Sequence, residues 1–191
     1  MWVLLILVIV VVLWMVAAYN GLISLKNQTV NAFKQIDVQL KRRHDPIPNL
    51  VNAVKGAMDF ERSTLEAVIQ ARNQAVKVNA SGGGPEAIKQ VSQAENALSG
   101  ALSRLLVTVE RYPQLKATGN IGQLQEELSS TENRIAFARQ LYNDTATQYN
   151  TKQQQFPTTL VAGLAHAERT DLWEIEDQAE RAVPQVDLSR R

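Results

Sequence analysis

The chain has 191 residues, enough for one domain with a substantial core, and its net charge of +1 argues against a general nucleic-acid-binding protein. It contains no cysteine, which excludes disulfides, thiolate chemistry and cysteine-based zinc sites. Alanine, glutamine, leucine and glutamate are abundant and alternating Val/Ile/Thr runs are absent, so the composition favours helix nearly everywhere.

The first element is an uncharged run from Trp2 to Ala18, WVLLILVIVVVLWMVAA. Its length is at the short end of the range for a membrane-spanning helix. Trp2 and Trp14 lie near its two ends and Tyr19 follows it, at positions where membrane proteins carry belts of aromatic side chains. Residues 1–18 are therefore predicted to be a retained single-pass membrane anchor.

Two other interpretations of this run stay open. A signal peptide would have a positive charge before its apolar run, and none precedes this one. Val16-Ala17-Ala18 nevertheless resembles a signal-peptide cleavage site. A buried core helix is disfavoured, because valine and isoleucine occupy every face. The positive-inside rule, applied to Lys26 and Lys34 after the run, places the rest of the chain in the cytoplasm.

Four long helices are predicted after the anchor, from apolar residues at helical spacing. Pro46 and Pro48 end the first helix, and the linker ASGGGP (Ala80–Pro85) separates the second from the third. The expected ranges are about 19–44, 48–79, 85–112 and 121–156. Short connections imply antiparallel neighbours. The predicted fold is therefore all-α: a transmembrane helix that continues into an antiparallel up-down four-helix bundle over 19–156.

Four basic residues, Lys41, Arg42, Arg43 and His44, crowd the end of the first bundle helix. Cations complement the negative end of a helix, and the prolines would then reverse the chain. The alternative is a patch that docks an acidic partner. At about 1.5 Å per residue, these residues lie roughly 35 Å beyond the anchor, too far to bind lipid headgroups.

Polar residues on one face of the fourth helix, Glu132, Arg139 and Asn143, suggest a second candidate site. In an enzyme they would be an acid and its electrostatic partner. In a bundle they would pair with groups on other helices, such as Asp37 or Glu110, and fix which helix packs where. The second interpretation, a polar bundle network, is favoured.

Residues 157–191 are predicted to form a membrane-proximal segment followed by an acidic arm. Leu160, Val161 and Leu164 form an apolar cluster, and the fourth helix is long enough to return to the bilayer. This segment is therefore expected at the membrane surface. Shallow insertion and folding under the bundle as a plug are equally open.

The arm carries an excess of acidic residues between Glu168 and Asp187. Leu172, Trp173 and Ile175 belong to a short C-terminal amphipathic helix with capping-box spacing at its start. Such a helix either covers its own bundle or docks on a neighbouring subunit.

Several motifs resemble the LemA family of bacterial membrane-anchored proteins. The longest is YNGLISLKNQTVNAFKQIDVQLKRRHDPIPNLVNAVKG (Tyr19–Gly56). Further matches follow in order: LEAVIQARNQA (Leu65–Ala75), LLVTVERYPQLKA (Leu105–Ala117), LQEELSSTENRIAFARQLYND (Leu124–Asp144) and QYNTKQQQFPTTLVAGL (Gln148–Leu164). Pro46, where an aliphatic residue is expected, and Phe33, where tryptophan is usual, depart from the pattern without affecting the fold. The resemblance implies a four-helix-like bundle at a membrane, and it implies no established activity.

Motifs for catalysis or cofactor binding are scarce. No Glu-x-x-His pair occurs, as a di-metal bundle site would need, and the two histidines, His44 and His166, have no metal-ligand spacing. There is no Gly-x-Ser-x-Gly elbow, and the glycine-rich Ser81–Pro85 lacks the Lys-Ser/Thr of a phosphate loop. No cofactor, metal or enzymatic activity is expected.

The function predicted from the sequence is that of a self-assembling scaffold in a bacterial inner membrane. It would form a homo-oligomer larger than a dimer, through complementary basic and acidic surfaces, and organise membrane or partner proteins. Its expected partners are membrane lipid, further copies of the chain and an unidentified protein, without nucleic acid. The first alternative is a signalling adaptor that relays a membrane state to a cytoplasmic partner, and the second is an enzyme.

Overall fold

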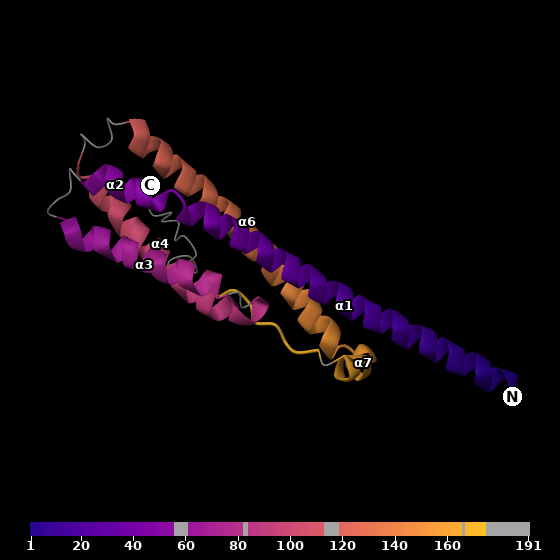
Figure 1. The fold of residues 1–191 in the computed structure, drawn as a ribbon. Helices are drawn as coiled ribbons and strands as arrows, with labels where there is room; N and C mark the ends of the chain where they lie inside the picture. Colours follow the sequence, from indigo (N-terminus) through magenta and orange to yellow (C-terminus); the bar gives the residue numbers. More distant parts are fainter. Residues whose placement is uncertain (56–60, 82–83, 113–118, 166, 175–191) are drawn as a thin grey trace, which may run out of the picture.

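The computed structural model describes residues 1–191 except 56–60, 82–83, 113–118, 166 and 175–191. The described part is helical and contains no strand (Figure 1), which confirms the all-α class for that part of the chain. Its helices are α1 (Trp2–His44), α2 (Ile47–Lys55), α3 (Arg62–Ala80), α4 (Ile88–Val109), α6 (Gly119–Gln154) and α7 (Thr158–Leu164), with a 3₁₀ turn η2 (Pro85–Ala87) before α4.

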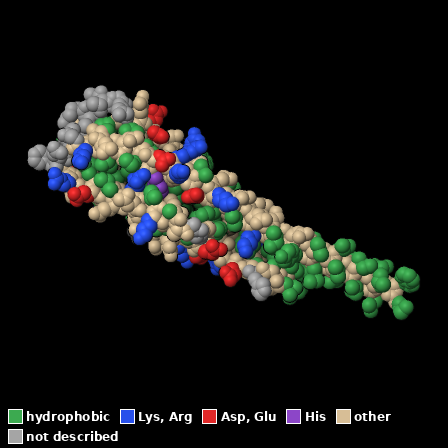
Figure 2. All heavy atoms as spheres, viewed as in Figure 1, with side chains coloured by type: hydrophobic (Ala, Val, Ile, Leu, Met, Phe, Trp, Pro, Cys, Tyr) green, Lys and Arg blue, Asp and Glu red, His purple; other side chains and the backbone are tan. Residues whose placement is uncertain are grey.

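Helix α1 joins the apolar N-terminal run and the first helix of the remaining structure in one element of 43 residues, about 64 Å long. Figure 2 shows hydrophobic side chains and no charged ones at its N-terminal end. Trp2, Trp14 and Tyr19 are exposed there. Within the described residues, α1 with its extension α2 is the one helix long and apolar enough to cross a membrane. A single-pass anchor fits this surface, because apolar area of this size needs lipid or protein to cover it.

The two prolines kink the chain at the end of α1 and do not reverse it. Asp45 keeps helical backbone angles, and α2 lies beyond α1 at the end of the molecule away from the N-terminus (Figure 1). Pro48 is the second residue of α2, where a missing backbone N–H costs no hydrogen bond. The range 48–79 that was predicted for one helix holds α2 and α3, and residues 56–60 between them lie outside the described part.

The long helices pack as two pairs, α1 with α6 and α3 with α4 (Figure 1). Residue numbers along α6 fall as those along α1 rise. Leu22 clusters with Tyr149 near the anchor, whereas Arg43 pairs with Glu132 further from it. We call residues 19–174, within the described part, the helical body.

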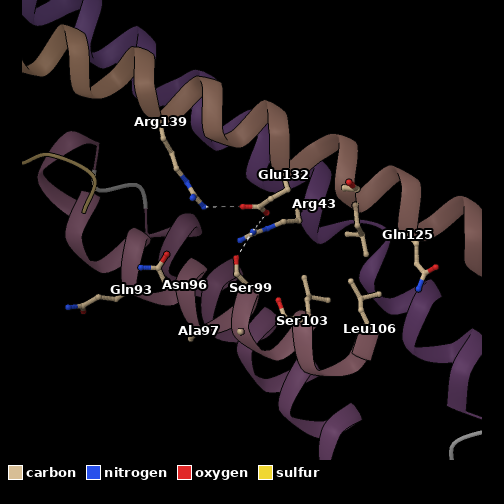
Figure 3. A pocket seen from close by; sticks show the side chains of 14 residues that line it. Arg43, Gln93, Asn96, Ala97, Ser99, Ser103, Leu106, Gln125, Glu132 and Arg139 are labelled. Carbon is tan, nitrogen blue, oxygen red and sulfur yellow. Dashed lines mark hydrogen bonds and ion pairs between the residues drawn. The ribbon is translucent and has the colours of Figure 1, made fainter. Parts of the chain in front are cut away.

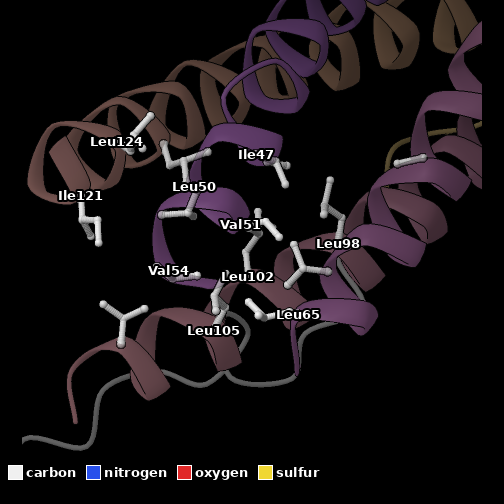
Figure 4. Packing of buried hydrophobic residues seen from close by; sticks show 14 of the residues in the cluster. Ile47, Leu50, Val51, Val54, Leu65, Leu98, Leu102, Leu105, Ile121 and Leu124 are labelled. Carbon is white, nitrogen blue, oxygen red and sulfur yellow. The ribbon is translucent and has the colours of Figure 1, made fainter. Parts of the chain in front are cut away.

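Three clusters of buried apolar side chains hold the helical body together. The distal cluster joins α2, α3, α4 and the start of α6 (Figure 4), the middle cluster joins α1, α4 and α6, and the basal cluster lies nearest the anchor. Representative members are Leu50, Val54, Leu65, Leu98, Leu105 and Leu124 in the distal cluster; Ile36, Leu40, Ile88, Val91, Ile135 and Tyr142 in the middle cluster; and Leu22, Tyr149 and Ala162 in the basal cluster. These residues come from the stripes that helical spacing predicted, with Ala162 as an addition from α7.

Candidate functional site

A layer of charged side chains lies between the distal and middle apolar clusters, with Arg43 of α1 at its centre (Figure 3). Its Nη1 donates to Glu132 Oε2 of α6 at 2.6 Å and to Ser99 Oγ of α4 at 2.9 Å. Its Nη2 donates to the carboxylate of Glu95 of α4, and to the Glu95 carbonyl oxygen at 3.3 Å. We call Arg43, His44, Glu95 and Glu132 the polar layer, which joins three helices.

Glu95 is the buried acceptor of the polar layer. His44 Nε2 lies 2.9 Å from Glu95 Oε1, and Asn79 Nδ2 donates to the same oxygen at 3.1 Å. Burial opposes the charge on this carboxyl. The hydrogen bond with His44 and the charge of Arg43 together outweigh burial and hold the pKa of Glu95 below its usual range. Glu95 is therefore a carboxylate at neutral pH, with partners on both oxygens.

The structure divides the predicted basic patch. Lys41 and Arg42 are exposed, whereas Arg43 and His44 are buried in the polar layer. Four successive helical residues cannot share one surface, because each turns by about 100° from the last. The alternative interpretation, a docking patch, therefore does not hold for Arg43 and His44. Arg72 Nε further fixes the end of α1 by donating to the His44 carbonyl oxygen at 2.9 Å.

The predicted polar bundle network is found in part. Arg139 Nη2 lies 3.6 Å from Glu132 Oε1, so these two residues meet. Asp37 and Glu110 are exposed, and Asn143 binds the C-terminal segment instead. Arg43 and His44 of α1 and Glu95 of α4 complete the network. The prediction of the network did not include these three residues.

A cavity of about 800 Å³ lies beside the polar layer, between α4 and α6. Asn96 and Ser99 of α4 face Glu132 and Arg139 of α6 across it (Figure 3). Ser99 Oγ accepts a hydrogen bond from Arg43, which is the opposite of the contact that activates a serine nucleophile. Among the residues that the structure describes, no group of three His, Cys, Asp or Glu side chains is placed to hold a metal ion. Chemically, this arrangement is suited to holding helices in register.

An extended segment after α7, residues 167–174, runs back along α6 and is held by two asparagines. Asn150 Oδ1 accepts from the Thr170 N–H at 2.9 Å, and Asn150 Nδ2 donates to the Thr170 carbonyl oxygen at 2.8 Å. Asn143 binds Trp173 in the same two-bond manner, at 2.8 and 3.1 Å. We call residues 167–174 the strap.

The spacing of the asparagines explains why the strap is extended. Asn143 and Asn150 are seven residues apart on a helix, a rise of about 10.5 Å. Thr170 and Trp173 are three residues apart, which is about 10 Å in an extended chain. Because the two distances match, each asparagine can satisfy both backbone polar groups of one strap residue.

Residues 175–191, on which most of the predicted amphipathic helix falls, lie outside the described residues. The strap corrects only the predicted start of that helix near Asp171, because residues 171–174 are not helical. Its backbone groups bind side chains of α6 and are not available for helical hydrogen bonds. Trp173 is buried in the middle cluster of its own chain, with Arg139 Cζ 4.7 Å from its ring centroid. Leu172 packs partly against the same cluster, and Ile175 lies outside the described residues.

Tyr142 also connects α6 to the strap, since its hydroxyl donates to the Asp171 carbonyl oxygen at 2.7 Å. Burial, together with the charges of Asp171 and Glu86, raises the pKa of this phenol above its usual range. The phenol therefore stays neutral and able to donate. Lys89 of α4 adds an ion pair with the Asp171 carboxylate at 3.3 Å.

Helix α7 turns one face to the helical body and the other away from it. Val161 is 3% exposed, whereas Leu160 and Leu164 are 64% and 69% exposed. The structure thus separates the three predicted membrane-surface residues. Val161 is packed as a plug requires, while Leu160 and Leu164 are free to meet a membrane.

A second exposed apolar surface lies on α1 and α6. Val38 of α1 and Phe137 and Leu141 of α6 line a groove, and Phe137 is 74% exposed. Lys34 and Arg134 also line this groove. We call it the α1/α6 groove; none of these residues was predicted from the sequence to form a site.

Two sequence signals could have located the buried polar features. Glu95 interrupts the apolar stripe of α4, four residues after Val91 and three before Leu98, and a charge at a core position indicates a buried partner. The pair Tyr-Asn occurs twice in YNDTATQYN, as Tyr142-Asn143 and Tyr149-Asn150. A repeat of seven residues places both pairs on the same face of a helix.

These features define a class of protein, in which a helical body is built on one long helix whose N-terminal part is apolar enough to cross a membrane. A family model described as the LemA family matches residues 32–188. The chain therefore belongs to the LemA family, which confirms the resemblance seen in the sequence motifs.

Curated relatives match along most of the chain. Protein LemA of Metamycoplasma hominis is 28% identical over 169 residues, which cover 88% of this chain and 72% of the relative. Magnetosome protein MamQ 2 of Paramagnetospirillum magneticum is 22% identical, over 82% of this chain and 64% of the relative. Magnetosome protein MamQ of Magnetospirillum gryphiswaldense is also 22% identical, over 80% of this chain and 63% of the relative. The family and these relatives indicate a membrane-associated protein.

Proposed function

We propose that this LemA-family chain is a membrane-anchored antiparallel four-helix bundle that assembles with further copies of itself into a scaffold. It stands in the bacterial inner membrane with its helical body in the cytoplasm, and it organises membrane or partner proteins without catalysing a reaction. The apolar part of α1 and the family membership support the membrane location. The polar layer and the strap support a rigid body, since each fixes one packing of the helices.

The α1/α6 groove gives the main support for self-assembly. Apolar side chains as exposed as Phe137 mark interaction surfaces when they gather in one groove. Because α1 runs unbroken from the anchor to Val38, copies in one membrane present their grooves at the same height. A second copy is therefore the partner that the anchor itself brings alongside at high local concentration.

Charge favours an assembly larger than a dimer. Lys34 and Arg134 line the groove, so two grooves facing each other would bring like charges together. A second surface lies on another face of α1, next to Val30, and is lined by three acidic and two basic residues: Glu86, Glu168, Asp171, Lys26 and Arg169. We call this surface, with its excess of one acidic residue, the acidic edge. Contact between the groove of one copy and the acidic edge of the next is heterologous, and such contacts form rings or filaments.

The mass of the full chain, purified with lipid in a mild detergent, tests this proposal. We expect a homo-oligomer larger than a dimer, and a lower mass for Phe137→Glu. Val107→Glu is the matched control, because Val107 is an exposed apolar residue of α4 outside the groove. A monomeric or dimeric wild-type chain, or an unchanged mass for Phe137→Glu, would contradict the proposal.

A further inference from the structure

The segment around α7 leaves α6 and returns to it at the anchor end of the helical body. Gln153 Nε2 donates to the Glu168 carbonyl oxygen at 3.2 Å, and the Asn150–Thr170 bonds lie just beyond this contact. These hydrogen bonds hold the two ends of this segment together against α6. We call residues 155–165 the foot.

The foot packs against α1 just above the apolar run. Ala162 lies in the basal cluster with Leu22 and Tyr149. Leu22 is four residues beyond Ala18, a rise of about 6 Å along α1. The foot therefore has a fixed height relative to the anchor.

That height coincides with the membrane surface. A hydrocarbon core of about 30 Å takes up about 20 helical residues, which places its boundary near Gly21 when the span begins at Trp2. If the span ends at Ala18 instead, Leu22 falls within the headgroup layer, which is about 5 to 8 Å thick. In both cases α7 lies at the boundary between lipid and water.

The outward surface of the foot is apolar at this height. Phe156, in the turn before α7, is 81% exposed, and Leu160 and Leu164 lie four residues apart on α7. Residues 153–167 contain no Asp, Glu, Lys or Arg, so no charged side chain has to enter the lipid. Short apolar faces held in the interface plane insert to the level of the acyl chains.

We propose that Phe156, Leu160 and Leu164 insert into the membrane leaflet beside α1, so that the protein holds the bilayer at two points. The inward side of α7, with Thr158 and Val161, stays packed against the helical body. This inference rests on the membrane anchor of the proposed function and is independent of self-assembly. The second contact would fix the tilt and rotation of the helical body, which a single helical anchor leaves free.

Nitroxide labels at single cysteines test the proposal, because the natural chain contains no cysteine. Full-length Leu160→Cys and Leu164→Cys are labelled in liposomes, and the collision rates of each label with oxygen and with a water-soluble nickel chelate are compared. Val10→Cys in the apolar run is the lipid control, and Val107→Cys on α4 is the water control. All four positions are exposed aliphatic residues, so labelling should leave the fold intact.

We expect labels at Leu160 and Leu164 to favour oxygen severalfold over the chelate, as at Val10, and the label at Val107 to favour the chelate. Labels at Leu160 and Leu164 that behave like Val107 would overturn the proposal. Labels shielded from both reagents would show that protein covers the foot and would also overturn it. A water-exposed label at Val10 would overturn the anchor and the foot together, whereas a monomeric chain with lipid-facing labels would overturn self-assembly alone.

Discussion

The polar layer and the strap both bury polar side chains, but they do so with different chemistry. In the polar layer, Arg43, Glu95 and Glu132 bring charges from three helices together, and His44 contacts the buried Glu95 carboxylate. In the strap, neutral asparagines of α6 bind the backbone of an extended segment. The charged polar layer fixes how helices pack on one another, whereas the neutral asparagines fix how the strap packs on α6.

The two regions should therefore respond differently when one member is lost. A charge left without its partner inside a protein is costly, and its loss should weaken every helix that it joins. A lost amide removes two hydrogen bonds from one segment only. Global unfolding should report mainly on the polar layer, and local opening should report mainly on the strap.

Glu95→Gln should have the largest effect, because it leaves Arg43 buried with too little negative charge. Breaking a buried pair by removing one partner costs about 3 to 5 kcal/mol, and we expect the free energy of unfolding to fall by that amount. Denaturant unfolding of the full chain in detergent, followed by circular dichroism, measures it.

Glu132→Gln is the matched variant from the same layer. The Glu132 side chain is 45% exposed, so its ion pairs are partly screened, and a loss of about 1 kcal/mol is expected. Glu126→Gln, an exposed change on the same helix, should stay within about 0.5 kcal/mol of the natural chain. Equal losses for the variants at Glu95 and Glu132 would show that burial does not decide the energetics of the layer.

Asn150→Ala should open the strap while the polar layer stays closed. Loss of both bonds to Thr170 should cost about 1 to 3 kcal/mol and speed hydrogen exchange at the Thr170 amide. Exchange within α4 should stay at its natural rate. Gln148→Ala, on an exposed position two residues away, is the control. Unchanged exchange at Thr170 would mean that the asparagine does not hold the strap.

The two regions should also limit stability on opposite sides of neutral pH. The pKa of Glu95 is lowered by folding, so its contribution is complete above the ordinary carboxyl pKa of about 4.3 and is lost as the pH falls through the folded value. The pKa of Tyr142 is raised, so stability should fall as the pH rises above the ordinary phenol value of about 10.

Unfolding measured across this pH range tests both directions. Glu95→Gln should reduce the pH dependence of the free energy of unfolding on the acid side only. Tyr142→Phe should flatten the alkaline side in part, since Tyr149 also has a raised pKa, and should cost about 1 kcal/mol at neutral pH through the lost hydrogen bond. A variant that changes the opposite side of the profile would show that the two regions are not separate.

Arg139 connects the two regions and should give the smallest effects. Its guanidinium pairs with Glu132 and lies over the ring of Trp173. A double-mutant cycle of Arg139→Ala with Trp173→Leu should give a coupling of about 0.5 to 1 kcal/mol. The cycle with Glu132→Gln should give about 0.2 to 1 kcal/mol. Zero coupling to Trp173 would remove the link between the layer and the strap.

Much of the helical body follows from sequence periodicity. Leu22, Ile36 and Leu40 repeat at helical spacing and are buried, because apolar area on one helical face must find a partner face. The kink after α1 was less predictable. Pro46 and Pro48 signal a break, but the direction of the chain after it depends on how α2 packs against the other helices.

The candidate sites were harder to predict, because their partners are distant in the chain. Arg43 and His44 look like surface residues until Glu95, on another helix, is placed beside them. The acidic composition of the C-terminal arm favours an exposed helix, whereas Asn143 and Asn150 impose an extended strap. In each case a specific tertiary contact overrides the local pattern.

Counting subunits in a membrane tests the central claim most directly. The full chain, fused at its C-terminus to a fluorescent protein, would be observed at low density in a bacterial membrane, and the bleaching steps in each spot would be counted. We expect spots with more than two steps, and fewer steps for Phe137→Glu but not for Val107→Glu. Spots with one or two steps for the natural chain would contradict the account of this protein as a self-assembling membrane scaffold.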